Sequence, residues 1–125
     1  FSILRAKENQ EVQEQYQEKD AAEIWEEFKK YINAIFLEKS ISPNFIYWEG
    51  KERNNNYKCY YFSYHDVLED FEKFSHIDLQ YRKEELFSFL KRENIILTKK
   101  HANGKEKIYQ NKKIYVLAVR KDKVN

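Results

Sequence analysis

Apolar side chains recur every three or four positions between Asp20 and about residue 39, which is the spacing of an amphipathic helix. The stripe consists of Ile24, Phe28, Ile32 and Ile35, widened by Trp25, Tyr31, Phe36 and Leu37. Asp20, with Glu23 three positions later, resembles a capping box in which Asp replaces Ser or Thr. We therefore predict a first helix over residues 20–39, ended by the segment that leads into Pro43.

Two β-prone segments follow, residues 44–50 (NFIYWEG) and 57–64 (YKCYYFSY), with the polar run KERNNN between them. This pattern predicts a β-hairpin with a long polar tip. Exposed aromatic side chains could stack on nucleic-acid bases, but Tyr and Phe in strands more often form core and cross-strand pairs. We therefore expect these aromatic side chains to pack within the domain.

Two further helical patterns come next in the chain. The first begins at Ser63 or Tyr64, and the second spans residues 79–94 after a short SHID connection in which Asp78 is the expected N-cap. Their apolar positions are Val67, Leu68, Phe71 and Phe74 in the first helix, and Leu79, Leu86, Leu90 and either Phe87 or Phe89 in the second.

The remainder of the chain has a strand pattern. Residues 94–98 predict a strand, HANG at 101–104 a turn, and KIYQ and KIYVLAVR, joined by the residues NK, a further strand pair. We predict a core between the first and third helices, closed by the last strand: Ile24, Phe28, Ile32, Leu86, Leu90, Ile114, Val116 and Leu117. Truncating Phe28 or Leu90 should be costly, whereas truncating Tyr16 or Val124 should cost almost nothing.

This order of elements predicts an α+β fold. Three helices with a β-hairpin after the last of them are the plan of a winged helix-turn-helix domain, to which the aromatic β-hairpin would be an insertion. We expect this domain to span residues 20–125. Residues 1–19 lack an apolar stripe and are expected to be a polar linker or a frayed helix, dispensable for folding.

Composition adds that 125 residues suit one domain and that a single cysteine, Cys59, permits no intrachain disulfide. No apolar run approaches the length of a membrane span, so we expect a cytoplasmic protein without membrane contact. The chain begins with Phe1 and holds no Met, which we interpret as a piece of a longer protein.

The positive charge is concentrated near the C-terminus. Residues 91–125 hold eleven Lys or Arg against three Asp or Glu, a net charge of +8, whereas residues 1–50 and 51–90 carry −4 and −2. This asymmetry favours a polyanionic partner for the C-terminal part, although a solvated, charged hairpin is an equally ordinary explanation.

We find no catalytic or metal-binding pattern. Gly50 and Gly104 are isolated, and none of the three histidines has a Cys or carboxylate at ligand spacing. Cys59 alone in a strand is most simply a small buried hydrophobe. We expect no enzymatic activity within these residues and no cofactor or metal.

Residues 57–119 carry a recognisable combination of motifs. A strand leads into a helix with an acidic start, the next helix ends in Leu90-Lys91 followed by Ile95-Ile96, and a basic hairpin contains the run from Asn111 to Val116. This combination resembles the C-terminal winged-helix region of primase–helicase-type replication proteins of phages and integrated mobile elements. The resemblance implies a larger parent protein that carries an ATPase motor upstream. The aromatic hairpin over residues 44–62 departs from this pattern.

The leading hypothesis is therefore a nucleic-acid-binding module, with double-stranded DNA as the expected partner. The third helix would lie in or across the major groove and the lysine-rich wing near phosphates. The candidate contacts are Gln80, Arg82, Lys83 and Lys91 around the helix, and Lys99, Lys100, Lys105, Lys107, Lys112 and Lys113 in the wing. Glu84 and Glu85 count against deep insertion of the helix, because they would face phosphates.

A module for protein–protein interaction is the alternative. The net charge of −6 over the first ninety residues suits a basic protein partner, and winged helices also form homodimers. In that case the aromatic hairpin would be the contact surface.

Overall fold

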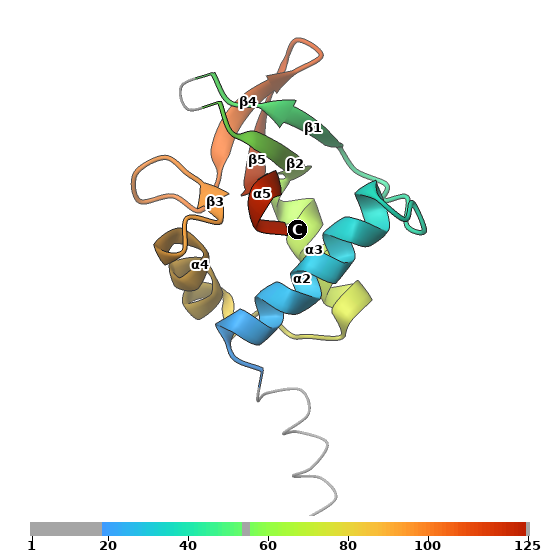
Figure 1. Cartoon of the computed structure of the whole chain (residues 1–125), viewed down its shortest axis with the longest axis vertical. Helices are drawn as coiled ribbons and strands as arrows, with labels where there is room; N and C mark the ends of the chain where they lie inside the picture. Colours follow the sequence, from blue (N-terminus) through green and yellow to red (C-terminus); the bar gives the residue numbers. More distant parts are fainter. Residues whose placement is uncertain (1–18, 54–55, 125) are drawn as a thin grey trace, which may run out of the picture.

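The computed structural model describes residues 19–53 and 56–124, so the expectations for residues 1–18, including Tyr16, lie outside it. The chain has an α+β fold built on an antiparallel sheet, as predicted (Figure 1). Its elements are α2 (Ala21–Phe36), β1 (Tyr47–Lys51), β2 (Lys58–Ser63), α3 (Tyr64–Ser75), α4 (Lys83–Arg92), β3 (Ile96–Leu97), β4 (Lys105–Tyr109), β5 (Lys112–Arg120) and α5 (Lys121–Val124).

Helix α2 begins where its capping residues predict. The backbone N–H of Glu23 donates to the Asp20 carboxylate at 2.9 Å, and the Glu23 carboxylate accepts from the Asp20 N–H at 3.4 Å. The helix ends at Phe36, three residues before the predicted end. The chain turns away there because Lys39 adopts a left-handed backbone conformation with φ 54°.

The sheet is organised around β5, the longest strand. Strand β2 pairs with residues 116–120 of β5, and β1 pairs with the other edge of β2. On the opposite edge of β5, β3 pairs at 118–119 and β4 at 112–116. Residues 112–115 of β5 therefore have β4 as their only strand partner among the described residues.

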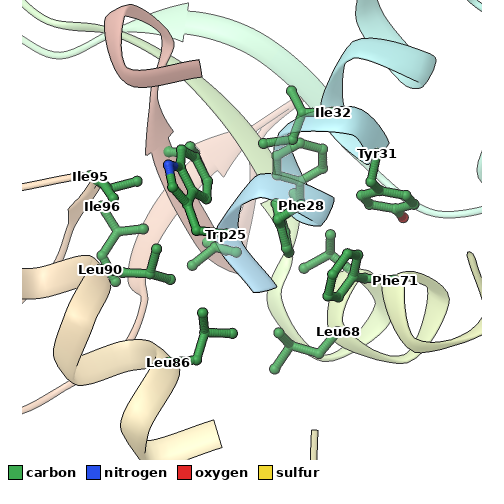
Figure 2. Packing of buried hydrophobic residues seen from close by; sticks show 14 of the residues in the cluster. Trp25, Phe28, Tyr31, Ile32, Leu68, Phe71, Leu86, Leu90, Ile95 and Ile96 are labelled. Atoms are coloured by element: carbon green, nitrogen blue, oxygen red, sulfur yellow. The ribbon is translucent and has the colours of Figure 1, made fainter. Parts of the chain in front are cut away.

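The main core lies between one face of the sheet and the helices. Helix α2 packs against both α3 and α4, so its apolar stripe lies between them (Figure 2). The predicted members Ile24, Phe28, Ile32, Leu86, Leu90 and Leu117 are all buried in this cluster. The aromatic hairpin contributes Tyr60 and Phe62, which confirms that its side chains pack within the domain.

A second, smaller cluster lies on the other face of the sheet. It consists of Cys59, Tyr61, Val116 and Ala118, with Trp48, Leu97 and Ile114 packed against it. The prediction that Ile114 and Val116 close the helical core was therefore wrong. Side chains alternate between the faces of a strand, so Leu117 and Val119 are the residues of β5 that face the helices. Cys59 is a buried free thiol, as expected.

The third predicted helix begins four residues later than expected. Asp78 does not cap it; its carboxylate instead accepts from the N–H of Gln80 at 2.9 Å, which makes a local turn. The Leu79 N–H donates to the Glu72 carboxylate of α3 at 2.8 Å, and the Arg82 N–H donates to the Leu79 carbonyl at 3.1 Å, so residues 79–82 form a turn after which α4 begins. Gln80 therefore lies before α4 and not on it.

Two C-terminal expectations also need correction. Val124 is 4% exposed and belongs to the main core, because the short helix α5, which was not predicted, folds back onto α2 and β2. The strand expected at 94–98 is limited to Ile96–Leu97. It is shorter because Asn94 has a left-handed φ of 56° and its N–H still bonds the carbonyl of Lys91 at the end of α4.

Candidate nucleic-acid interface

The β4–β5 hairpin carries the lysines that the sequence singled out. Its turn consists of Gln110 and Asn111, one residue earlier than predicted, with Tyr109 paired to Lys112. Both turn residues have positive φ, 50° and 67°, which is the geometry of a two-residue hairpin loop matched to the twist of its strands. The turn therefore places Lys112 and Lys113 at an exposed tip.

The same hairpin is joined to the aromatic hairpin by a buried carboxylate. Glu52, in the loop after β1, is 7% exposed and is the one charged side chain among the described residues that is buried. It accepts hydrogen bonds from Lys107 Nζ at 2.8 Å, from Lys105 Nζ and from the Tyr61 hydroxyl. We call these four residues the Glu52 cluster. The two lysines share the single negative charge of this carboxylate, so both are held within the fold and the cluster keeps a net charge of +1.

Electrostatics keep Glu52 ionised. Burial alone would raise the pKa of its carboxyl, but hydrogen bonds from two lysines and from Tyr61 outweigh burial and lower this pKa to about 2. Burial and the bond to Glu52 raise the pKa of the Tyr61 hydroxyl, so Tyr61 stays protonated and donates. The cluster is therefore ionically paired across the neutral and mildly acidic pH range.

A ring stack reinforces this junction. The Trp48 ring of β1 stacks on the Tyr109 ring of β4 with centroids 4.5 Å apart, and it contacts the Tyr61 ring of β2 in a tilted arrangement at 4.9 Å. Strands β1 and β4 are separated by β2 and β5, so in a flat sheet they would lie about 14 Å apart. The contact between Trp48 and Tyr109 means that the sheet curls until its two edge strands meet.

The remaining hairpin lysines are exposed. Lys99 and Lys100 lie in the loop between β3 and β4, where the N–H of Ala102 bonds the Lys99 carbonyl at 3.1 Å. Lys112 has no ion pair among those found in the described residues, and Lys113 has only a surface pair with Glu106 at 3.7 Å. Exposed ion pairs contribute little energy, so Lys113 can exchange this partner for a phosphate.

The candidates around α4 are placed less uniformly. Arg82 pairs with Glu85 at 3.3 Å, and Lys83 lies over the Tyr64 ring at 5.4 Å from its centroid. Gln80 is exposed in the connection before the helix, and Lys91 is exposed in the last turn. The exposed carboxylates Glu84 and Glu85 lie in the first turn of α4, where they interact favourably with the helix dipole and would repel a nearby phosphate.

The structure thus separates the ten candidates into three groups. Lys91, Lys99, Lys100, Lys112 and Lys113 are exposed cations, whereas Lys105 and Lys107 are held by Glu52. Arg82 and Lys83 are half-buried against Glu85 and the Tyr64 ring, and Gln80 is exposed but uncharged. Sequence reasoning missed Glu52 because it read the run KERNNN as a polar tip. Strand alternation predicts that Lys105 and Lys107 share one face of β4, but it does not show that Glu52, just after β1, lies beside that face.

A scan against protein-family models matches none of them, and searches of curated proteins and of solved structures find no match either. Over residues 19–53 and 56–124, no helix is long and apolar enough to cross a membrane. Within the same residues, no three His, Cys, Asp or Glu side chains gather in a group that could hold a metal ion.

Proposed function

We propose that this chain is a winged-helix module that binds double-stranded DNA and belongs to a larger replication or mobile-element protein. The observation that carries the proposal is the position of the β4–β5 hairpin. It projects from the sheet beyond the end of β2 with exposed lysines at its tip, in the place of a wing that follows a helix pair (Figure 1).

The arrangement of strands supports the winged-helix assignment. Strand β2 leads directly into α3, α4 follows, and β5 lies between β2 and the broken strand formed by β3 and β4. The strand β1, which pairs with the other edge of β2, and the loop after it are an addition to that plan. A cytoplasmic location belongs to the same proposal, since the one cysteine is a free thiol.

The burial of the aromatic hairpin favours this function over a protein-interaction module. Tyr60, Tyr61 and Phe62 are at most 2% exposed, so they cannot present a contact surface to a partner. The exposed lysines have no comparable role inside the fold. Lysine contacts to phosphates provide affinity and register without sequence information, so we expect binding that depends weakly on sequence.

Replacing Lys112 and Lys113 by Glu should weaken binding to two unrelated duplexes alike, by about 10–100-fold at low salt. The control is the replacement of Lys30 and Lys39 by Glu, which changes the net charge by the same amount. Lys30 is exposed on α2, and Lys39 is exposed just after this helix. Fluorescence anisotropy with labelled duplexes measures both. Equal affinities for the two double variants would contradict a contact through the hairpin tip.

A further inference from the structure

The hairpin that carries Lys112 and Lys113 is weakly supported by the sheet itself. Strand β2 pairs with β5 only over residues 116–120. Residues 112–115 of β5, on the side of the turn, are therefore bonded to β4 alone. A two-stranded ribbon is marginally stable in water and bends easily. The direction in which this hairpin points must therefore be set by contacts other than strand pairing.

Glu52 supplies the strongest of these contacts. Its carboxylate bonds two lysines of β4 that lie 53 and 55 positions further along the chain. The two lysines stand on the same face of β4, two residues apart, so a single carboxylate holds the strand at two points. The stack of Trp48 on Tyr109 holds the same strand a third time, next to the turn.

We propose that Glu52 is a positioning residue for nucleic-acid binding, which fixes the basic hairpin in the orientation that α4 and the exposed lysines require. This inference rests on the proposed function. Lys105 and Lys107 then serve the fold by bonding Glu52, and the phosphate contacts fall to the lysines at the tip and in the β3–β4 loop. Holding a binding element in place raises affinity by reducing the ordering that binding must impose.

The proposal makes a prediction opposite to that of net charge alone. Glu52 and Glu106 are both carboxylates beside hairpin lysines, and removing either makes the chain more basic by one unit. If charge alone mattered, both removals would tighten binding to DNA. Glu106 is exposed and pairs only at the surface with Lys113, so its removal leaves the hairpin in place.

The test compares Glu52→Gln with Glu106→Gln in the full chain, using a labelled random-sequence duplex at low salt. We expect Glu106→Gln to bind as well as the unmodified chain or up to about threefold tighter, and Glu52→Gln to bind about fivefold weaker. Backbone amide exchange in residues 105–115 should become faster in Glu52→Gln only. This exchange readout reports hairpin mobility independently of DNA.

A third variant provides the same test if Glu52→Gln does not fold. Trp48→Leu changes no charge and lies on β1, outside the interface, yet it removes the ring stack on Tyr109. It should weaken binding about twofold and raise exchange in the same hairpin residues. Together the two variants separate positioning from charge.

The inference is overturned if Glu52→Gln, or Trp48→Leu where Glu52→Gln does not fold, binds as tightly as Glu106→Gln. Unchanged exchange in the hairpin overturns it as well. If the unmodified chain binds no duplex at low salt, the proposed function fails, and the role of Glu52 in binding fails with it. Normal binding by the unmodified chain with no loss in the variants refutes the positioning role alone.

Discussion

Truncating Phe28 to Ala should lower the free energy of unfolding by about 3–5 kcal/mol. Phe28 is 3% exposed, and its ring lies 4.7 Å from the Phe71 ring, 5.7 Å from Tyr31 and 6.4 Å from Phe62, measured between centroids. These rings come from α2, α3 and β2, so the cavity would open where three elements meet (Figure 2). A loss of this size is a large fraction of the stability of a small domain.

Tyr81 provides the matched control for this truncation. It is also aromatic but 83% exposed, so Tyr81→Ala should change stability by less than about 0.5 kcal/mol. Urea denaturation followed by circular dichroism measures both variants. If Phe28→Ala unfolds at the same urea concentration as Tyr81→Ala, the placement of Phe28 in the core between the helices and the sheet is wrong.

Acidification should remove about 3 kcal/mol of stability through Glu52 alone. The pKa of this carboxyl is about 2 in the folded chain, against 4.5 for the unperturbed group. Between these values the unfolded chain binds the proton and the folded chain does not. The contribution is therefore complete above about pH 5 and is lost as the pH falls towards 2.

The variant Glu52→Gln isolates this effect from that of the other carboxylates. At pH 7 the variant should be less stable than the unmodified chain by about 1–3 kcal/mol, since a hydrogen-bonded charge is lost while both lysines can turn into water. The difference should begin to shrink below about pH 5 and approach zero only as the pH falls to about 2 and below. Urea midpoints across the pH range measure it, and a gap that stays constant from pH 6 to pH 3 would show that the carboxylate is not ionically paired.

Elements with a local signal could be predicted from the sequence. The capping residues and apolar stripe defined α2 to within a few residues, and the turn signals located both hairpins. These features depend on neighbours in sequence, so no knowledge of the fold was needed. The buried positions of α2 and α4 followed from the same periodicity.

Features that depend on distant contacts were missed. Helix α4 begins later than predicted because the Leu79 N–H donates to the carboxylate of Glu72 in α3. No local sequence pattern predicts this hydrogen bond. Val124 is buried because α5 returns to the core. Both faces of β5 carry apolar side chains, so the sequence pattern does not indicate which face the helices cover.

The sequence predicted which hairpin carries the lysines of the candidate interface, but not which of those lysines are exposed. A count of lysines cannot distinguish exposed Lys112 from Lys107, which bonds Glu52. The distinction requires the curled sheet that brings β1 beside β4, and this curl results from contacts between residues more than fifty positions apart. Charge thus identified the hairpin, and the fold identified which of its cations are available.

Binding of the unmodified chain to a random-sequence duplex, measured over a range of salt concentrations, tests the central claim most directly. The five exposed candidates are Lys91, Lys99, Lys100, Lys112 and Lys113. If they contact phosphates, the logarithm of the association constant should fall linearly with that of the salt concentration, with a slope of about −4.5. Two unrelated duplexes should give the same slope. No binding at about 50 mM salt, or an affinity that salt does not change, would contradict the claim that this hairpin binds nucleic acid.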